Sequence, residues 1–494
     1  MIKKYILALD QGTTSSRAVL FDNEFNVLGI EQSETTQIFP KPGWVEQDAT
    51  EIRETQIFVA RKLISRLGVD SKQINGIGIT NQRETTILWD KKTGQPVYNA
   101  IVWQDKRTSD LCEQINKDDF SEYIRKSTGL VIDSYFSGTK VLWLLDNIKG
   151  LREKAEKGQI LFGTVDTWLI WNLSGGRLHI TDYSNASRTL LYSIHDKCWD
   201  KEILDYFNIP LQMMPEVVES SGTYGKTEKG IFGNSEVMLS GIAGDKQAAL
   251  FGQTCFDEGD AKNTYGTGCF MLMNTGDKPF KSKSGLLTTI AWGLNGKITY
   301  ALEGSVFIAG AAIQWLRDKL RLIESASDTE KIAFEVTDSA GVYFVPAFSG
   351  LGAPFWNMNA IGIITGLTAG VDYRHIVRAA LESMAFQTRD VLNAMQKDSG
   401  IEIGNLNVDG GASANNFLLQ FQADILGVDV SRPEFVESTA LGAGFLAAIG
   451  SGVCEIEDLK KFRKTDKVFH SNMSDSDRQG LCLGWTNAID KARK

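Results

Sequence analysis

The sequence offers little from which a zinc site or a set of disulfides could be built. Its six cysteines are scattered and include no C-x-x-C pair, and its four histidines lie far apart. Neither set has the spacing of zinc ligands or of the disulfide frameworks found in small secreted domains. We therefore expect neither a structural zinc site nor a disulfide framework.

Long apolar runs and an excess of positive charge are also missing. No stretch approaches the roughly 18 apolar residues of a membrane span. The apolar run Tyr5–Leu9 stops at Asp10, too early for the core of a signal peptide. A formal net charge of −9 argues against nucleic acid or an anionic membrane as the main partner. We expect a cytoplasmic protein without membrane insertion and without a nucleic-acid partner.

The rest of the composition is that of an ordinary globular protein. A length of 494 residues suggests two or three domains, on a prior of roughly 150 residues each. Strand-like and helix-like patterns mix along the whole chain, which predicts an α/β fold. Strands are expected at Ile6–Leu9, Ala18–Phe21, Gly76–Ile79 and Thr85–Trp89, and helices at Ala49–Leu67, Tyr135–Asn147, Arg374–Gln396 and about Ala414 to Leu426.

The helix expected from Ala49 carries both a start signal and an apolar face. Asp48 stands directly before it, where an aspartate can cap the first backbone N–H groups. The residues expected on its buried face are Ile52, Phe58, Val59 and Leu63.

The segment from Tyr5 to Leu20 predicts a β-hairpin whose turn suits a phosphate group. An apolar run ends at Asp10, turns through Gly12, Thr13, Thr14 and Ser15, and resumes after Arg17 as a second apolar run. The glycine allows close approach of backbone N–H groups, the hydroxyls can donate to phosphate oxygens, and the arginine supplies a cation. Asp10 could hold a divalent metal through water. The alternative is a plain surface hairpin with a polar turn.

A weak internal echo suggests two related halves. Residues Ala261–Met273 again give a strand, a Gly-Thr turn around Gly266-Thr267-Gly268, and a second strand. Two such hairpins could face one nucleotide from opposite sides, with the seam near Leu250–Phe256. We therefore expect one domain over residues 1–252 and a second over 253–494. Chance similarity between two Gly-Thr turns is the alternative.

Three common nucleotide motifs are incomplete. Gly225-Lys226-Thr227 ends like a Walker A loop, but Ser220 stands where its first glycine belongs. Gly76-Ile-Gly78 lacks the third glycine of a dinucleotide fingerprint. Nothing resembles the H-R-D and D-F-G pair of protein kinases. A phosphate-handling enzyme of another fold is indicated.

A second chemical centre is Gly241-Ile-Ala-Gly244-Asp245-Lys246-Gln247, followed by an apolar helix. The glycines permit a tight turn that leaves the carboxylate of Asp245 exposed in a cleft. Such a carboxylate can accept the proton of a substrate hydroxyl during phosphoryl transfer. The alternative is a simple helix N-cap.

A third centre is the pair Arg83-Glu84, which closes one expected strand and opens the next. Adjacent Arg and Glu are usually a solvated pair that contributes little. At a domain cleft, however, they offer donors and an acceptor to vicinal hydroxyls. Trp103 and Phe270 could pack on a carbon skeleton and Tyr135 adds a hydroxyl, although each aromatic alone is more often part of a core.

Over Tyr5 to about Ala448 the chain resembles the FGGY family of carbohydrate kinases, and within it the bacterial-type glycerol kinases. The resemblance thins after Ala448 and around Lys226–Val237. It is carried by long motifs: Tyr135-Phe-Ser-Gly-Thr-Lys140-Val-Leu-Trp143, Gly362-Ile-Ile-Thr-Gly366-Leu with His375-Ile-Val-Arg-Ala-Ala-Leu-Glu382, Asn81-Gln-Arg-Glu-Thr-Thr86, Pro42-Gly-Trp-Val-Glu46 and Tyr265-Gly-Thr-Gly-Cys-Phe270.

The resemblance implies two ribonuclease H-like, actin-like ATPase domains around a central cleft that holds MgATP and glycerol. It implies that glycerol is phosphorylated to sn-glycerol 3-phosphate plus ADP, with Asp245 as general base. Implied contacts to glycerol come from Arg83, Glu84, Trp103, Tyr135, Asp245 and Phe270, and those to ATP from Thr13, Thr14, Ser15, Arg17, Thr267, Gly310, Gln314, Gly411, Ala412 and Asn415. Asp10 and Asp245 would position Mg²⁺.

The sequence departs from the family at Lys246, where the G-D-Q-Q motif leads us to expect glutamine. Lys246 would touch the substrate end of the site, so we count it among the expected substrate-binding residues, and it bears on specificity. The alternatives are a related polyol or sugar kinase, and an actin-like ATPase that serves as a chaperone or filament. We also expect a homo-oligomer, either a dimer or a tetramer.

Overall fold

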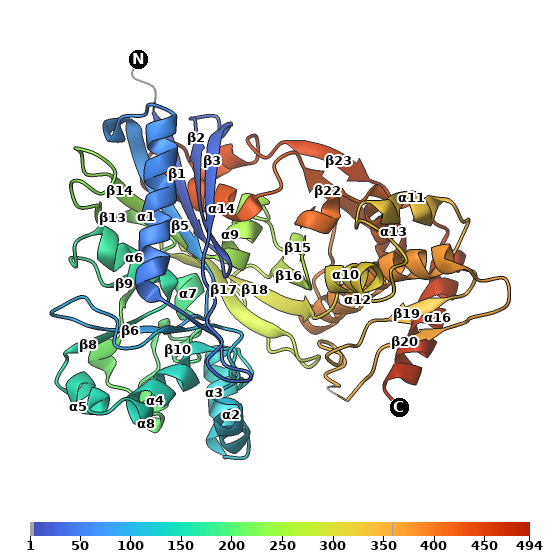
Figure 1. Cartoon of the computed structure of the whole chain (residues 1–494), viewed down its shortest axis with the longest axis horizontal. Coiled ribbons are helices and arrows are strands. Elements are labelled where there is room, and N and C mark those ends of the chain that lie inside the picture. The colour runs from blue at the N-terminus through green and yellow to red at the C-terminus, as the bar shows by residue number, and fades with distance from the viewer. Residues whose placement is uncertain (1–3, 358) are drawn as a thin grey trace.

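The computed structural model describes residues 4–357 and 359–494 and is organised around two β-sheets (Figure 1). The first sheet has six strands in the order β13-β14-β5-β1-β2-β3. Their bounds are Ser221–Lys226, Met238–Gly244, Ile74–Asn81, Tyr5–Gln11, Ser15–Phe21 and Val27–Glu34. The second sheet has seven strands in the order β17-β18-β16-β15-β21-β22-β23. Their bounds are Leu287–Leu294, Lys297–Val306, Cys269–Asn274, Ala261–Tyr265, Asn405–Asp409, Asp429–Pro433 and Thr465–Phe469.

Each sheet contains one of the two predicted hairpins beside parallel strands. β1 and β2 are antiparallel with Asp10 opposite Arg17, and β15 and β16 are antiparallel with Tyr265 opposite Cys269. β5 runs parallel to β1 in the first sheet, as β21 runs parallel to β15 in the second. Both predicted hairpins are therefore confirmed, and so is the similarity in structure between them.

The central strand β1 is buried on both faces, since alternate side chains of a strand point to opposite sides. Leu7 and Leu9 pack in a core with α1 (Ala49–Arg66) and α6 (Val165–Leu173). Ile6 and Ala8 pack in a second core with helices α9 (Asp245–Gly252) and α14 (Ser438–Gly450).

Helix α1 begins as predicted, with the Asp48 carboxylate accepting a hydrogen bond from the N–H of Thr50. Three of the four residues expected on its buried face are buried, namely Ile52, Val59 and Leu63. Phe58 is 57% exposed, so its placement on that face was wrong. It directly precedes Val59 and therefore stands about 100° further round the helix.

Below the first sheet in Figure 1 lie further elements of the first half of the chain: β6 (Ile87–Asp90), α2 (Ser109–Asn116), α3 (Phe120–Thr128), α4 (Ser137–Asn147), α5 (Leu151–Glu156), β8 (Ile160–Gly163), β10 (Tyr192–Ser193) and α8 (Lys201–Tyr206). The first half also has the short strands β4 (Glu46–Gln47), β7 (Ala100–Ile101), β9 (Ile180–Asp182), β11 (Cys198–Trp199) and β12 (Glu216–Val218). The short helix α7 (Tyr183–Ala186) contacts β14 of the first sheet and β17 of the second. The expected strand from Thr85 and helix from Tyr135 each begin two residues later, so both predicted starts lie in the preceding loops.

The second sheet is covered by the long helix α12 (Tyr373–Ser399) and by shorter elements. These are α10 (Gly310–Asp318), α11 (Asp328–Phe334), β19 (Tyr343–Val345), β20 (Ile363–Thr365), α13 (Asn416–Leu426) and α16 (Asp475–Ala492). Helix α15 (Ile456–Leu459) is not among them, because its Leu459 packs in the core that contains Ile6 and Ala8 of β1. The predicted helices at 374–396 and 414–426 correspond to α12 and α13. No helix in the described part of the chain is both long and apolar enough to cross a membrane.

Helix α14 returns from the second half of the chain to the first sheet (Figure 1). It approaches so closely that a Cβ atom at Gly78 of β5 would overlap the carbonyl oxygen of Ala443. A Cβ atom at Gly442 would likewise overlap the carbonyl oxygen of Ala248 in α9. Glycine is thus required on β5, where α14 approaches it, and on α14, where it approaches α9. Both contacts join α14, from the second half of the chain, to the first half.

Candidate active site

The first-sheet motifs meet at one edge because their strands are parallel. β1, β5 and β14 pair in register, with Gln11 opposite Asn81 and Asn81 opposite Gly244. The residues that follow these strand ends are the hydroxyl-rich turn, the Arg83-Glu84 pair and Asp245. Binding sites of open α/β sheets lie outside such carboxyl ends.

Asp245 is the first residue of α9 and lies at the centre of this edge. Its Oδ1 is 3.5 Å from Nε of Arg83, and its Oδ2 is 3.0 Å from Nζ of Lys246. The N-cap residue is Gly244, so the simple capping alternative is not what is observed. Burial raises the pKa of Asp245, but the charges of Lys246 and Arg83 outweigh burial and hold that pKa below its ordinary value. The side chain is 26% exposed and ionised at neutral pH.

Lys246 turns into the site. Besides its ion pair with Asp245, its ammonium lies 4.6 Å from the ring centroid of Phe270, a cation–π distance. The lysine therefore joins the predicted base to an aromatic residue of the second sheet.

Arg83 and Glu84 are buried, unlike the solvated pair that adjacent Arg and Glu usually form. Nη2 of Arg83 donates to the hydroxyl of Tyr135 at 3.4 Å. The indole of Trp103 makes an edge contact with the ring of Tyr135, with centroids 5.4 Å apart. Nε1 of Trp103 donates to Oγ1 of Thr13 at 2.9 Å, which ties these aromatics to the phosphate-type turn. The structure thus brings together the residues that the family resemblance assigns to the phosphoryl acceptor. We call Arg83, Glu84, Trp103 and Tyr135 the acceptor residues.

The phosphate-type turn is tight, because the N–H of Gly12 donates to the carbonyl of Ser15 at 2.9 Å. The guanidinium of Arg17, which was expected to supply a cation to this turn, is already paired with other side chains. The guanidinium of Arg17 forms an ion pair with Glu437 at the start of α14 and donates to Oε1 of Gln32. An incoming phosphate would have to compete with Glu437 for Arg17.

Asp10, the residue predicted to hold a metal, lies among other charged side chains. Burial raises its pKa to about 7, with Arg17 opposing this effect and Glu437 and Asp245 adding to it. Two carboxylates within mutual electrostatic reach favour a bound cation. Within residues 4–357 and 359–494, no group of three or more His, Cys, Asp or Glu side chains could hold a metal.

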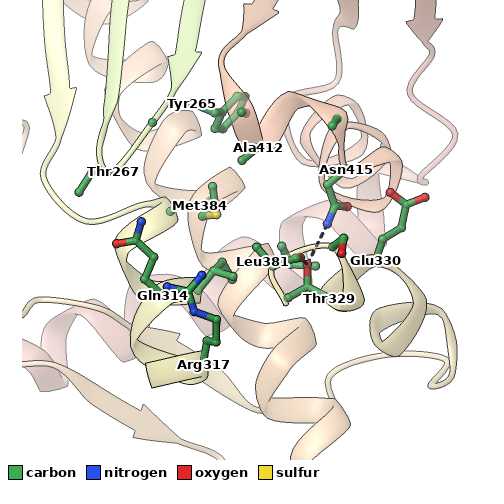
Figure 2. Close-up of a pocket in the computed structure, with 17 residues that line it drawn as sticks. Tyr265, Thr267, Gln314, Arg317, Thr329, Glu330, Leu381, Met384, Ala412 and Asn415 are labelled. Atoms are coloured by element: carbon green, nitrogen blue, oxygen red, sulfur yellow. Dashed lines mark hydrogen bonds between the residues drawn. The ribbon is translucent and has the colours of Figure 1, made fainter. Parts of the chain in front are cut away.

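A cavity of about 510 Å³ opens on the second sheet (Figure 2). The N–H of Gly310 donates to the carbonyl of Gly266 at 3.0 Å, so α10 starts against the second hairpin turn. In Figure 2, Gln314 and Arg317 line one side, and Asn415 donates to Thr329 on the other. All six residues predicted for the nucleotide side line this cavity: Thr267, Gly310, Gln314, Gly411, Ala412 and Asn415. Sequence reasoning missed other lining residues, including Arg317, Glu330, Leu381 and Met384.

Three polar residues beside Arg83 were also missed. Glu303 of β18 and Arg188 after α7 join its ion pairs, and Oε1 of Gln247 accepts a hydrogen bond from its Nη1 at 3.2 Å. Gln247 stood within the quoted Gly-Asp motif, which could have indicated it. Arg188 and Glu303 lie in unremarkable sequence, and no signal singled them out.

Two family models cover most of the chain. The N-terminal domain of the FGGY family of carbohydrate kinases matches residues 5–252, and the C-terminal domain of that family matches residues 261–451. A glycerol kinase of Carboxydothermus hydrogenoformans is 59% identical over 495 residues, covering 100% of this chain and 99% of the relative. Glycerol kinase 2 of Thermotoga maritima is 59% identical over 490 residues, covering 99% of each chain.

Solved structures agree with this assignment. The crystal structure of Plasmodium falciparum glycerol kinase with ADP superposes with a TM-score of 0.95 at 37% identity, covering 99% of this chain and 98% of the other. A gluconate kinase from Lactobacillus acidophilus, at 22% identity and a TM-score of 0.88 over 99% and 98% of the two chains, shares the fold. The two sheets and their helices form the actin-like, ribonuclease H-like ATPase fold. The chain belongs to the FGGY family of carbohydrate kinases.

Proposed function

We propose that the chain is a glycerol kinase, which transfers the γ-phosphoryl group of ATP to glycerol and releases sn-glycerol 3-phosphate and ADP. The observation that carries the proposal is the ionised carboxylate of Asp245 beside Arg83, within one cluster with Tyr135 and Trp103. The 59% identity to curated glycerol kinases over the whole chain supports the same acceptor.

The acceptor residues suit a small polyol. Arg83 and Tyr135 offer hydrogen-bond donors, while Glu84 offers an acceptor. Trp103 and Phe270 provide apolar surface for the carbon chain. Hydrogen bonds from these groups to neighbouring hydroxyls of the polyol would fix which oxygen approaches Asp245, and such positioning is a large part of the rate gained in phosphoryl transfer.

Asp245 would act as the general base. Its pKa is held below the ordinary value, so the carboxylate is available to accept the proton of the terminal hydroxyl as the phosphoryl group moves. Lys246 and Arg83 keep this carboxylate oriented through their ion pairs.

The phosphate end would be formed by Thr13, Thr14 and Ser15, with Arg17 recruited from Glu437. Asp10 and Asp245 would hold Mg²⁺ together with phosphate oxygens, and the ion would neutralise charge on the transferred group. The nucleotide would occupy the cavity lined by Thr267, Gly310, Gln314, Gly411, Ala412 and Asn415. Closure of the cleft would exclude water, which otherwise competes as acceptor. The homo-oligomer and the cytoplasmic location stay predictions.

An ADP-release assay with a panel of glycerol, xylulose, ribulose and gluconate tests this function. We expect glycerol to give the highest kcat/KM and the product to be sn-glycerol 3-phosphate. Preference for a sugar would indicate a related sugar kinase. ATP hydrolysis that no acceptor stimulates would indicate an actin-like ATPase of another kind.

A further inference from the structure

Four buried charged residues form one ion-pair cluster beneath the acceptor residues: Arg83, Glu84, Arg188 and Glu303. Each is at most 3% exposed. Nη1 and Nη2 of Arg83 lie 2.5 and 3.0 Å from the two carboxylate oxygens of Glu303. Arg188 donates to Glu303 at 3.0 Å and to Glu84 at 2.8 Å. The cluster is electrically balanced, with two cations and two anions.

Glu303 holds both arginines. Burial raises its pKa, but the charges of Arg188 and Arg83 outweigh burial and lower that pKa to about 2. Glu303 is therefore ionised at any pH at which the protein functions. Its two oxygens bind the fork of Arg83, and a bidentate pair fixes the plane of a guanidinium. The Nε edge is left facing Glu84 at 3.4 Å and Asp245 at 3.5 Å.

The cluster joins the two halves of the chain. Arg83, Glu84 and Arg188 belong to the first half, whereas Glu303 stands on β18 of the second sheet, opposite Leu272 of β16. β16 also carries Phe270. A neutral link runs beside this contact, because Gln247 accepts from Arg83 and donates to the carbonyl of Ile290 in β17 at 3.3 Å.

We propose that Glu303 is a positioning residue, through which the position of the second sheet determines the orientation of the acceptor residues. It orients Arg83 directly and Glu84 through Arg188. β18 ends at Val306, and α10 begins soon after it at Gly310, which lines the nucleotide cavity. A displacement of β18 on nucleotide binding would therefore reach the acceptor residues through this carboxylate. Acceptor affinity then depends on nucleotide occupancy. This inference rests on the proposed function.

The first test is Glu303→Asp, which keeps the charge but shortens the side chain by one methylene, so that it cannot reach both arginines. We expect the KM for glycerol to rise at least about tenfold, a loss of about 1.4 kcal/mol in binding. We expect kcat to fall less than about threefold and the Kd for ADP to change less than about twofold. A parallel rise in the glycerol KM and the ADP Kd would overturn the positioning role.

The second test measures coupling between the two ligands. We expect the Kd for glycerol in the wild type to decrease when a non-hydrolysable ATP analogue is bound. In Glu303→Asp, the ratio of the glycerol Kd without the analogue to the glycerol Kd with it should fall toward one. Equal ratios in the two proteins would overturn the inference.

Arg188→Lys, which keeps its charge but lacks the guanidinium fork, should raise the glycerol KM in the same way. An unchanged glycerol KM in that variant would also count against the positioning role of the cluster.

Asp200→Asn is the matched control. Asp200 is a buried carboxylate that caps α8 and accepts hydrogen bonds from the hydroxyls of Ser127 and Tyr123, neither of which is an acceptor residue. The Asp200→Asn substitution should lower the midpoint of thermal unfolding and leave the KM for glycerol unchanged. If the wild type does not phosphorylate glycerol, the proposed function fails. If it does and Glu303→Asp retains wild-type KM and coupling, only the positioning role fails.

Discussion

Nζ of Lys246 lies 3.0 Å from Oδ2 of Asp245. Lys246, which stands where the family pattern gives glutamine, therefore places a positive charge directly beside the proposed base. An opposite charge this close favours the ionised carboxylate, and a base of lower pKa works at lower pH but is intrinsically weaker. The Lys246 side chain points into the site rather than into solvent, since its ammonium also lies against the ring of Phe270.

Lys246→Gln should raise the pKa of the acidic limb of kcat/KM. The ammonium of Lys246 is the charge that lowers the pKa of Asp245 most. Without it, Asp245 takes up its proton at a higher pH, and the protonated carboxyl group cannot act as the base below that pH. Glycerol should remain the preferred acceptor, since glutamine can also hydrogen-bond a hydroxyl. An unchanged pH profile would mean that this ion pair does not persist in solution, and a switch to another polyol would mean that the acceptor is wrongly assigned.

Glu437→Gln should lower the KM for ATP by about two- to fivefold. Glu437 holds Arg17 away from the phosphate-type turn, and partly exposed ion pairs contribute about 0.2–1 kcal/mol. Removing the carboxylate frees Arg17 and takes a negative charge from the vicinity of the phosphates. Glu434→Gln removes a charge from an exposed position on the same segment and serves as control. A higher KM for ATP in Glu437→Gln would contradict this account.

Gly78→Ala should destabilise the contact between α14 and the first sheet. The added methyl group would meet the carbonyl of Ala443, and overpacking of this kind costs about 1–3 kcal/mol or more where backbone is hit. Thermal unfolding should show a lower midpoint than in the wild type. Gly404→Ala, where a methyl group meets nothing within 4 Å, should unfold like the wild type. Equal midpoints in both variants would mean that α14 packs more loosely.

The sequence predicted best what depends on local order along the chain. The Gly-Thr hairpin and Asp245 could be recognised because their glycines, hydroxyls and carboxylates stand next to one another. What it did not predict depends on residues distant in the sequence. Glu303 meets Arg83 across 220 positions, and Glu437 meets Arg17 across 420 positions. No local pattern reports such pairs, because they exist only after both sheets have formed.

The most direct test of the central claim is the turnover of Asp245→Asn with glycerol and ATP. The amide has nearly the same shape but cannot accept the hydroxyl proton, so kcat should fall by at least about 10²-fold. The Kd values for glycerol and ADP, measured on the same preparation, should stay within about threefold of the wild type. A variant that retains near wild-type kcat would show that Asp245 is not the base.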